Sequence, residues 1–147
     1  MIETGAVGKE YPAVLYEVAG GGIAEYARTM GIDAPFHFEH EAARGAGFRD
    51  IVAPPMYAAV YSAPAIFAVM NDPEVGMDVP RNLHASQWFV WSEPVCAGDT
   101  IFTEATVAEI VERDSKGFYV FETVSANQHG QETVRGVWTN IVRLRNA

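Results

Sequence analysis

The chain has 147 residues, of which 49% are hydrophobic and 20% charged, a composition that indicates a folded globular protein and excludes intrinsic disorder. Asp and Glu number 19 against 10 Lys and Arg, and the formal net charge of −9 argues against a general binder of nucleic acid or of anionic membranes. Cys96 is the single cysteine and cannot form an intrachain disulfide, and the first residues lack the pattern of a signal peptide, so we predict a cytoplasmic protein with one domain over residues 1–147.

The first third of the chain predicts a short strand followed by two helices. Residues 13–18 are β-branched and aromatic, and they lie between a proline and a run of three glycines at 20–22, which we expect to form a loop. Ile23, Tyr26, Ala27 and Met30 follow with the spacing of one helix face. Residues 39–44 predict a second, short helix.

The most apolar stretch covers residues 51–70 and contains three prolines. Its length is near the lower limit for a membrane span, so we interpret it as a buried core helix over residues 56–70. Pro54 and Pro55 suit the start of this helix because the first N–H groups of a helix have no intrahelical acceptor. Pro64 should kink or split it.

The second half changes to a period of two, which is typical of strands. Residues 83–95 form one strand-like run, and three longer runs follow over 100–111, 118–126 and 133–144, joined by turns. We predict an α+β fold in which a single curled antiparallel sheet covers the buried helix. An exposed edge of such a sheet favours pairing with a second copy or with a similar chain.

Four segments, taken together and in this order, carry a resemblance to a known family. They are Val7-Gly8-Lys9 with Tyr11, Asp33-Ala34-Pro35-Phe36-His37, the stretch from Ala42 to Met56, and Pro94-Val95-Cys96-Ala97-Gly98-Asp99. The chain resembles the MaoC-like hotdog-fold hydratases and dehydratases, and within them the N-terminal, FAS1-like dehydratase variant. The resemblance implies a hotdog fold, in which the curled sheet wraps around a long central helix.

The resemblance also implies a reaction: reversible hydration of 2-enoyl thioesters of coenzyme A or acyl carrier protein to (3R)-3-hydroxyacyl thioesters. Such chemistry needs a base, a group that holds the water, and a donor for the enolate oxygen. It requires no metal or redox cofactor. The implied assembly is a homodimer, or a heterodimer with a similar hotdog chain.

His37 matches the catalytic histidine of the family, and imidazole suits proton transfer near neutral pH. Asp33 is the expected partner of His37, although the family's aspartate lies five residues before the histidine, where this chain has Ile32. Ala34 replaces the usual asparagine. A turn or helix-cap role for Asp33 therefore stays open.

The expected oxyanion donors are the N–H groups of Met56 and Tyr57 at the start of the central helix. Pro55 stands where hydratases of this family often have glycine, and proline has no N–H. The FAS1-like variant typically carries Ala-Pro-Pro here, and in its paired members the complete dyad often lies in the other hotdog unit. His84 occupies a strand position where family members carry a polar residue that faces the acyl tunnel, so a tunnel or partner-contact role is open, but a core or surface histidine without such a role is the favoured interpretation.

Two other functions remain open from the sequence. A non-catalytic hotdog subunit that builds the acyl pocket of a MaoC-like partner is favoured by Ile32, Ala34 and Pro55. An acyl-CoA thioesterase would need an acid or a histidine on the central helix, and residues 57–70 contain none. The spacing of His37 and His40 allows a metal site, but no third ligand supports one, and we expect none.

Overall fold

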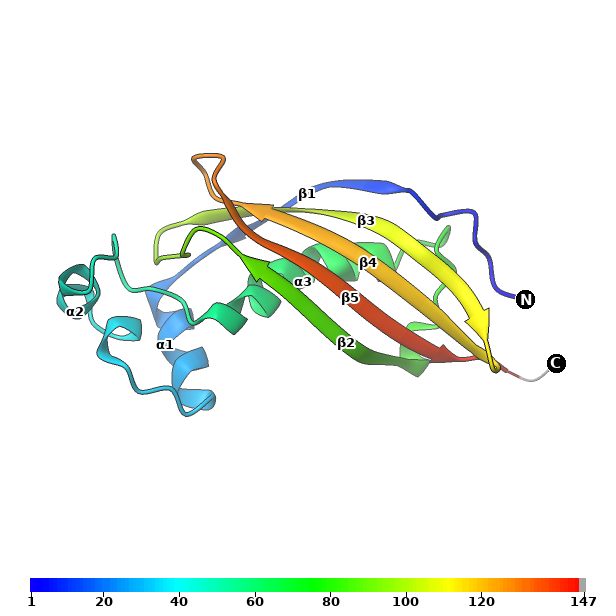
Figure 1. Ribbon diagram of the computed structural model, residues 1–147, viewed down its shortest axis with the longest axis horizontal. Coiled ribbons are helices and arrows are strands. Elements are labelled where there is room, and N and C mark those ends of the chain that lie inside the picture. The colour runs from blue at the N-terminus through cyan, green and yellow to red at the C-terminus, as the bar shows by residue number, and fades with distance from the viewer. Residues whose placement is uncertain (146–147) are drawn as a thin grey trace.

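The computed structural model describes residues 1–145 and shows one five-stranded antiparallel sheet curled around a helix (Figure 1). The sheet order is β1-β3-β4-β5-β2. The strands are β1 (Glu10–Glu17), β2 (Asn82–Trp91), β3 (Thr100–Arg113), β4 (Lys116–Ala126) and β5 (Glu132–Arg143). The expected α+β hotdog architecture is confirmed.

The three long strands predicted in the second half form the centre of the sheet. β3 pairs with β4 and β4 with β5, each antiparallel. Asp114 and Ser115 join β3 to β4 with φ angles of 50° and 59°, the left-handed conformation that a two-residue hairpin turn requires. Side chains on alternate positions, such as Ile101, Thr103 and Ala105, are buried on the face toward the helix.

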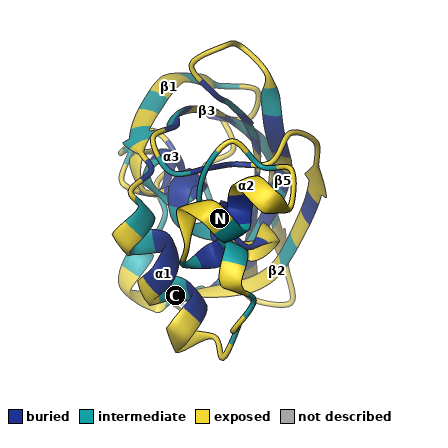
Figure 2. Cartoon of the chain, turned by 90° about the vertical axis from the view of Figure 1, so that its left-hand side faces the viewer, coloured by how far each residue is buried: buried dark blue, intermediate teal, exposed yellow. Residues whose placement is uncertain are grey.

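The central helix α3 (Ala58–Met70) follows a 3₁₀ turn, η2 (Pro55–Tyr57), and packs on β1, β3 and β4. Viewed along the molecule, it lies inside the curl of the sheet (Figure 2). The helix continues through Pro64 without a break, so the expected split does not occur. Tertiary packing around α3 explains this, because it outweighs the loss of one backbone hydrogen bond.

Helix α1 (Gly20–Thr29) begins at the first glycine of the run and includes all three, so the prediction of a loop there is wrong. Gly22 shows why glycine is used in this turn: a Cβ on it would lie 3.1 Å from the hydroxyl oxygen of Tyr57. The short helix α2 (His40–Gly45) agrees with the prediction for residues 39–44 within the usual end effects.

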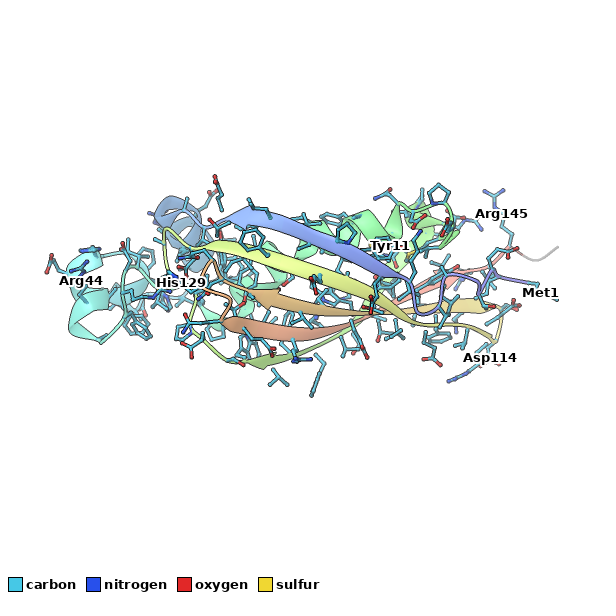
Figure 3. All side chains as sticks on the ribbon, turned by 90° about the horizontal axis from the view of Figure 1, so that it is seen from above. Met1, Tyr11, Arg44, Asp114, His129 and Arg145 are labelled. Carbon is cyan, nitrogen blue, oxygen red and sulfur yellow. The ribbon has the colours of Figure 1, made fainter. Side chains whose placement is uncertain are left out.

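The two ends of the molecule differ in their elements (Figure 3). Arg44 marks the end formed by α2, whereas Met1, Asp114 and Arg145 lie together at the opposite end. Within the described part of the chain, every helix is too short or too polar to cross a membrane.

Candidate active site

An apolar pocket of about 430 Å³ lies between the loop that precedes α3 and the segment that follows β2. Phe36, His37 and Phe48 contribute to its wall from the loop side, and Trp91 and Glu93 contribute from the other side. The indole nitrogen of Trp91 donates to the carbonyl of Pro55 over 2.8 Å and so ties the end of β2 to the start of the central helix. Apolar walls with a few polar groups are typical of small-molecule sites.

His37 is the imidazole of this pocket, and its side chain is buried. It ends the 3₁₀ turn η1 (Pro35–His37), in which Pro35 fixes the first position. Its Nδ1 lies 2.6 Å from the carbonyl oxygen of Val52. A carbonyl can only accept, so Nδ1 carries the proton and the neutral ring has its lone pair on Nε2. His37 is therefore oriented as a base.

The segment that holds His37 is itself fixed from two sides. The N–H of Val52 donates to the carbonyl of Phe36, while the carbonyl of Val52 accepts from His37, so the two segments exchange hydrogen bonds in both directions. The N–H of Ala53 donates to the carbonyl of Val95, and an isolated bridge pairs Val52 with Cys96. The imidazole position thus depends in part on backbone contacts that residues 52 and 53 make with residues 95 and 96.

The buried carboxylate of Asp99 anchors the stretch that contains Val52, because it binds Arg49, three residues earlier. Asp99 has 1% of its side chain exposed and accepts two hydrogen bonds of 2.9 Å from the guanidinium of Arg49. The N–H of Cys96 and the amide of Gln128 also donate to it. Burial by itself would raise the pKa of Asp99, but these hydrogen bonds outweigh it and hold the pKa below its ordinary value.

Asp33 does not join His37 in the pocket. Its side chain is exposed, and it is not part of the pocket wall. A spacing of four residues from the histidine, with the rigid Pro35 between them, leaves Asp33 on the outer side of the loop. The structure therefore does not bring the expected pair together.

The two expected oxyanion donors differ in availability. The N–H of Tyr57 donates to the carbonyl of Pro54 over 2.9 Å, so it is engaged within the helix start. The N–H of Met56 lies in the first turn of η2, where such groups have no intrahelical acceptor. The Tyr57 ring is buried against Tyr16 and Tyr26, and neither Met56 nor Tyr57 is part of the pocket wall, which reaches the adjacent Pro55.

His84 lies on the edge strand β2 and outside the pocket wall. Its ring stacks on Trp138 with centroids 5.4 Å apart, and its Nε2 lies 3.0 Å from the amide oxygen of Gln87. His84 is exposed, and among the described residues β5 is the one strand that pairs with β2, so β2 forms an edge of the sheet.

Sequence reasoning did not select Tyr61, Trp91 or Glu93 as site residues. Tyr61 projects from α3 into the pocket wall, and burial raises its pKa to about 12, so its phenol stays protonated at neutral pH. Glu93 stands directly before Pro94-Val95, the start of the fourth segment that carries the family resemblance. The one sequence signal that could have indicated Glu93 is its position next to Pro94-Val95.

The arrangement combines a base, a carboxylate and a phenol with a largely apolar wall. Such a site can bind an acyl chain and move a proton at one end of it. Residues 1–145 bring together no group of three or more His, Cys, Asp or Glu side chains that could hold a metal ion.

Comparison with known families gives a match over most of the chain. The family described as "FAS1-like, dehydratase domain region" matches residues 5–135. A UPF0336 protein of Saccharopolyspora erythraea is 33% identical over 138 residues, covering 93% of this chain and 88% of the relative. A UPF0336 protein of Clavibacter michiganensis is 32% identical over 137 residues, covering 92% of both.

Solved structures share the fold at low sequence identity. A chain of the C-terminally truncated HadBC (3R-hydroxyacyl-ACP dehydratase) complex of Mycobacterium tuberculosis has a TM-score of 0.82 and 22% identity, covering 95% of this chain and 99% of that one. The R-hydratase PhaJ1 of Pseudomonas aeruginosa has a TM-score of 0.74 and 21% identity, covering 95% and 83%.

Proposed function

The chain belongs to the family of FAS1-like dehydratase domains, and on this premise we propose that it adds water to 2-enoyl thioesters and, in reverse, removes water from (3R)-3-hydroxyacyl thioesters. The thioester is one of coenzyme A or of acyl carrier protein. The observation that carries the proposal is the environment of His37, which is buried in an apolar pocket. Its Nδ1–H donates to the carbonyl oxygen of Val52, which leaves the lone pair of Nε2 for the substrate.

In the forward reaction, Nε2 of His37 takes a proton from water as the water oxygen bonds to C3 of the enoyl group. The electron pair of the C2=C3 bond shifts toward the thioester carbonyl and forms an enolate. The imidazolium then gives its proton to C2, which returns the ring to its starting state. The N–H of Met56, at the positive end of the helix start, is the proposed donor to the enolate oxygen.

The test uses the purified full-length chain and crotonyl-CoA, with loss of the conjugated enoyl absorbance as the measurement. The assay is run with the chain alone and with a co-expressed MaoC-like chain that has an intact Asp-x-Asn-Pro-x-His loop. We expect hydration in at least one of the two preparations. Absence of hydration in both, or release of free thiol in place of hydration, would refute the proposal.

A second candidate is a non-catalytic subunit that shapes the acyl pocket of a catalytic partner. The exposed position of Asp33, away from His37, favours it, because the pair that the family uses is not assembled in this chain. The structural neighbours include one described as a HadBC complex and another described as a ChsH1-ChsH2 complex. In this case the chain would be inert alone and would raise the rate of its partner.

Both candidates involve a hotdog partner, and we propose that it pairs with the edge of β2. The other edge, β1, carries Pro12, two glutamates and a register shift, which are devices that hinder pairing with another strand. β2 has no Asp, Glu, Lys or Arg over ten residues. It exposes four large hydrophobic side chains: Leu83, Trp88, Val90 and Trp91.

Two leucines allow a matched test of this edge. Leu83 on β2 is 64% exposed and Leu15 on β1 is 53% exposed. We expect Leu83→Lys to raise the Kd of the dimer or heterodimer by about 10-fold or more, because a charge on the edge opposes strand pairing. Leu15→Lys should leave the Kd unchanged. Sedimentation of the single chain and co-purification with the partner measure both, and an equal response of the two variants would place the interface elsewhere.

A further inference from the structure

The proposed hydration needs a group that holds and orients the attacking water beside the base. Asp33 does not meet this need in the described structure, because it is not among the residues that line the pocket with His37. A carboxylate is well suited to the task because it accepts the second hydrogen of the water while the imidazole takes the first.

Glu93 is the one Asp or Glu among the described residues that line the pocket with His37. Its backbone is fixed as an extension of β2 along β5, since the N–H of Ser92 donates to Thr133 and that of Glu93 donates to Glu132. Pro94 follows and restricts the backbone of Glu93 to extended conformations. The position of Glu93 is thus set by the sheet, on which the rest of the fold depends.

The charges around Glu93 leave its carboxylate free for a ligand. The charge of Glu93 acts on Arg49, whose pKa is raised first by the hydrogen bond from its guanidinium to Asp99 and to a smaller extent by the charge of Glu93. Both terminal nitrogens of Arg49 are engaged by Asp99 at 2.9 Å. Glu93 therefore feels the positive charge of Arg49, but among the described residues its carboxylate forms no ion pair.

We infer that Glu93 is the carboxylate of this active site and holds the water that His37 deprotonates, in the place that sequence spacing gives to Asp33. The inference rests on the proposed function. In the step, the water donates one hydrogen bond to Glu93 and one to Nε2 of His37. The O–H bond to His37 breaks as the C3–O bond forms, and Glu93 keeps its hydrogen bond to the new hydroxyl group without changing its own protonation.

The experiment compares Glu93→Gln with Asp33→Asn in the full-length chain, together with its partner if the wild type needs one. Each replaces a carboxylate by an amide of the same shape at an exposed position, so we expect both to fold. Hydration of crotonyl-CoA should fall about 100-fold in Glu93→Gln and stay unchanged in Asp33→Asn. The melting temperature checks that folding is equal.

A second readout separates holding water from general damage to the pocket. Butyryl-CoA has no leaving group at C3, and exchange of its C2 protons with deuterated solvent needs the base but not the held water. We expect Glu93→Gln to keep this exchange within about 3-fold of the wild type while hydration is lost. A structural role of Glu93 would lower both.

The outcomes are distinct. Normal hydration by Glu93→Gln, loss of hydration in Asp33→Asn, or parallel loss of exchange and hydration in Glu93→Gln would each overturn the inference and leave the proposed function in place. Absence of exchange in the wild type would contradict the step in which His37 moves the C2 proton. A wild type that hydrates no enoyl thioester, alone or with its partner, would remove the proposed function and this inference together.

Discussion

Replacing His37 by alanine is expected to lower the rate of thioester hydration by about 100- to 10,000-fold, the range over which a positioned general base contributes. The reason is specific to the ring. His37 is the imidazole in the pocket wall, and its Nδ1 bond to the Val52 carbonyl leaves Nε2 as the basic atom. The variant also leaves that carbonyl without its partner, which should cost about 1 kcal/mol of stability.

His40→Ala is the matched control for this variant. His40 lies three residues further along the chain at the first position of α2, is exposed, and pairs with Asp50 at 2.7 Å away from the pocket wall. Its removal should leave kcat and KM as they are. A loss of activity in both variants would indicate that the loop tolerates no change, and the effect of His37→Ala would then say nothing about catalysis by the ring.

His37→Ala also decides between the two candidate functions when its activity is measured in a complex of this chain with a MaoC-like partner. Four preparations are compared, in which His37 of this chain and the loop histidine of the partner are each present or replaced by alanine. The proposed function expects activity to persist when only the partner's histidine is replaced and to fall when His37 is also replaced. If activity depends on the partner's histidine alone, the chain is the non-catalytic subunit.

Much of the fold could be predicted from local patterns. The period of two over β3, β4 and β5 and the turn residues between them are local signals, and the structure has these strands as consecutive neighbours. The apolar run after Pro54-Pro55 likewise predicted the central helix. The loop that was wrongly predicted at the glycine run and the absence of a split at Pro64 have one cause, since packing against the rest of the fold outweighs local propensity at both places.

The site was less accessible to sequence reasoning than the fold. A loop histidine two residues after a proline is a local signal, whereas the side on which Asp33 lies depends on one residue of spacing. Glu93 reaches the pocket only because the end of β2 approaches the segment before α3, and no periodicity encodes that approach. For the same reason the sequence indicates Asp99 only as the last residue of the fourth segment of the resemblance, although in the structure it is a buried anion paired with Arg49, fifty positions away.

Replacing Asp99 by alanine is expected to have the largest effect on stability, a loss of about 3 kcal/mol in the free energy of unfolding at pH 7. The variant removes the partner of Arg49 and leaves the buried N–H of Cys96 without an acceptor. Urea unfolding measures the loss. Asp33→Ala, at an exposed carboxylate, should change stability by less than about 0.5 kcal/mol.

The pH dependence of this difference has a definite sign. The pKa of Asp99 lies below its ordinary value in the folded protein, because its hydrogen bonds from Arg49, Cys96 and Gln128 outweigh the effect of burial. Its stabilisation is therefore fully present above about pH 4, near the ordinary pKa of an unfolded aspartate, and is lost as the pH falls through the lower folded value. The gap between wild type and Asp99→Ala should be constant from pH 7 to pH 5 and narrow below pH 4. A gap that stays constant into the acid range would show that shape, and not charge, is what Asp99 contributes.

Because Asp99 anchors the segment whose Val52 carbonyl orients His37, a variant that loses this charge should lose hydration activity as well, even at temperatures where it remains folded.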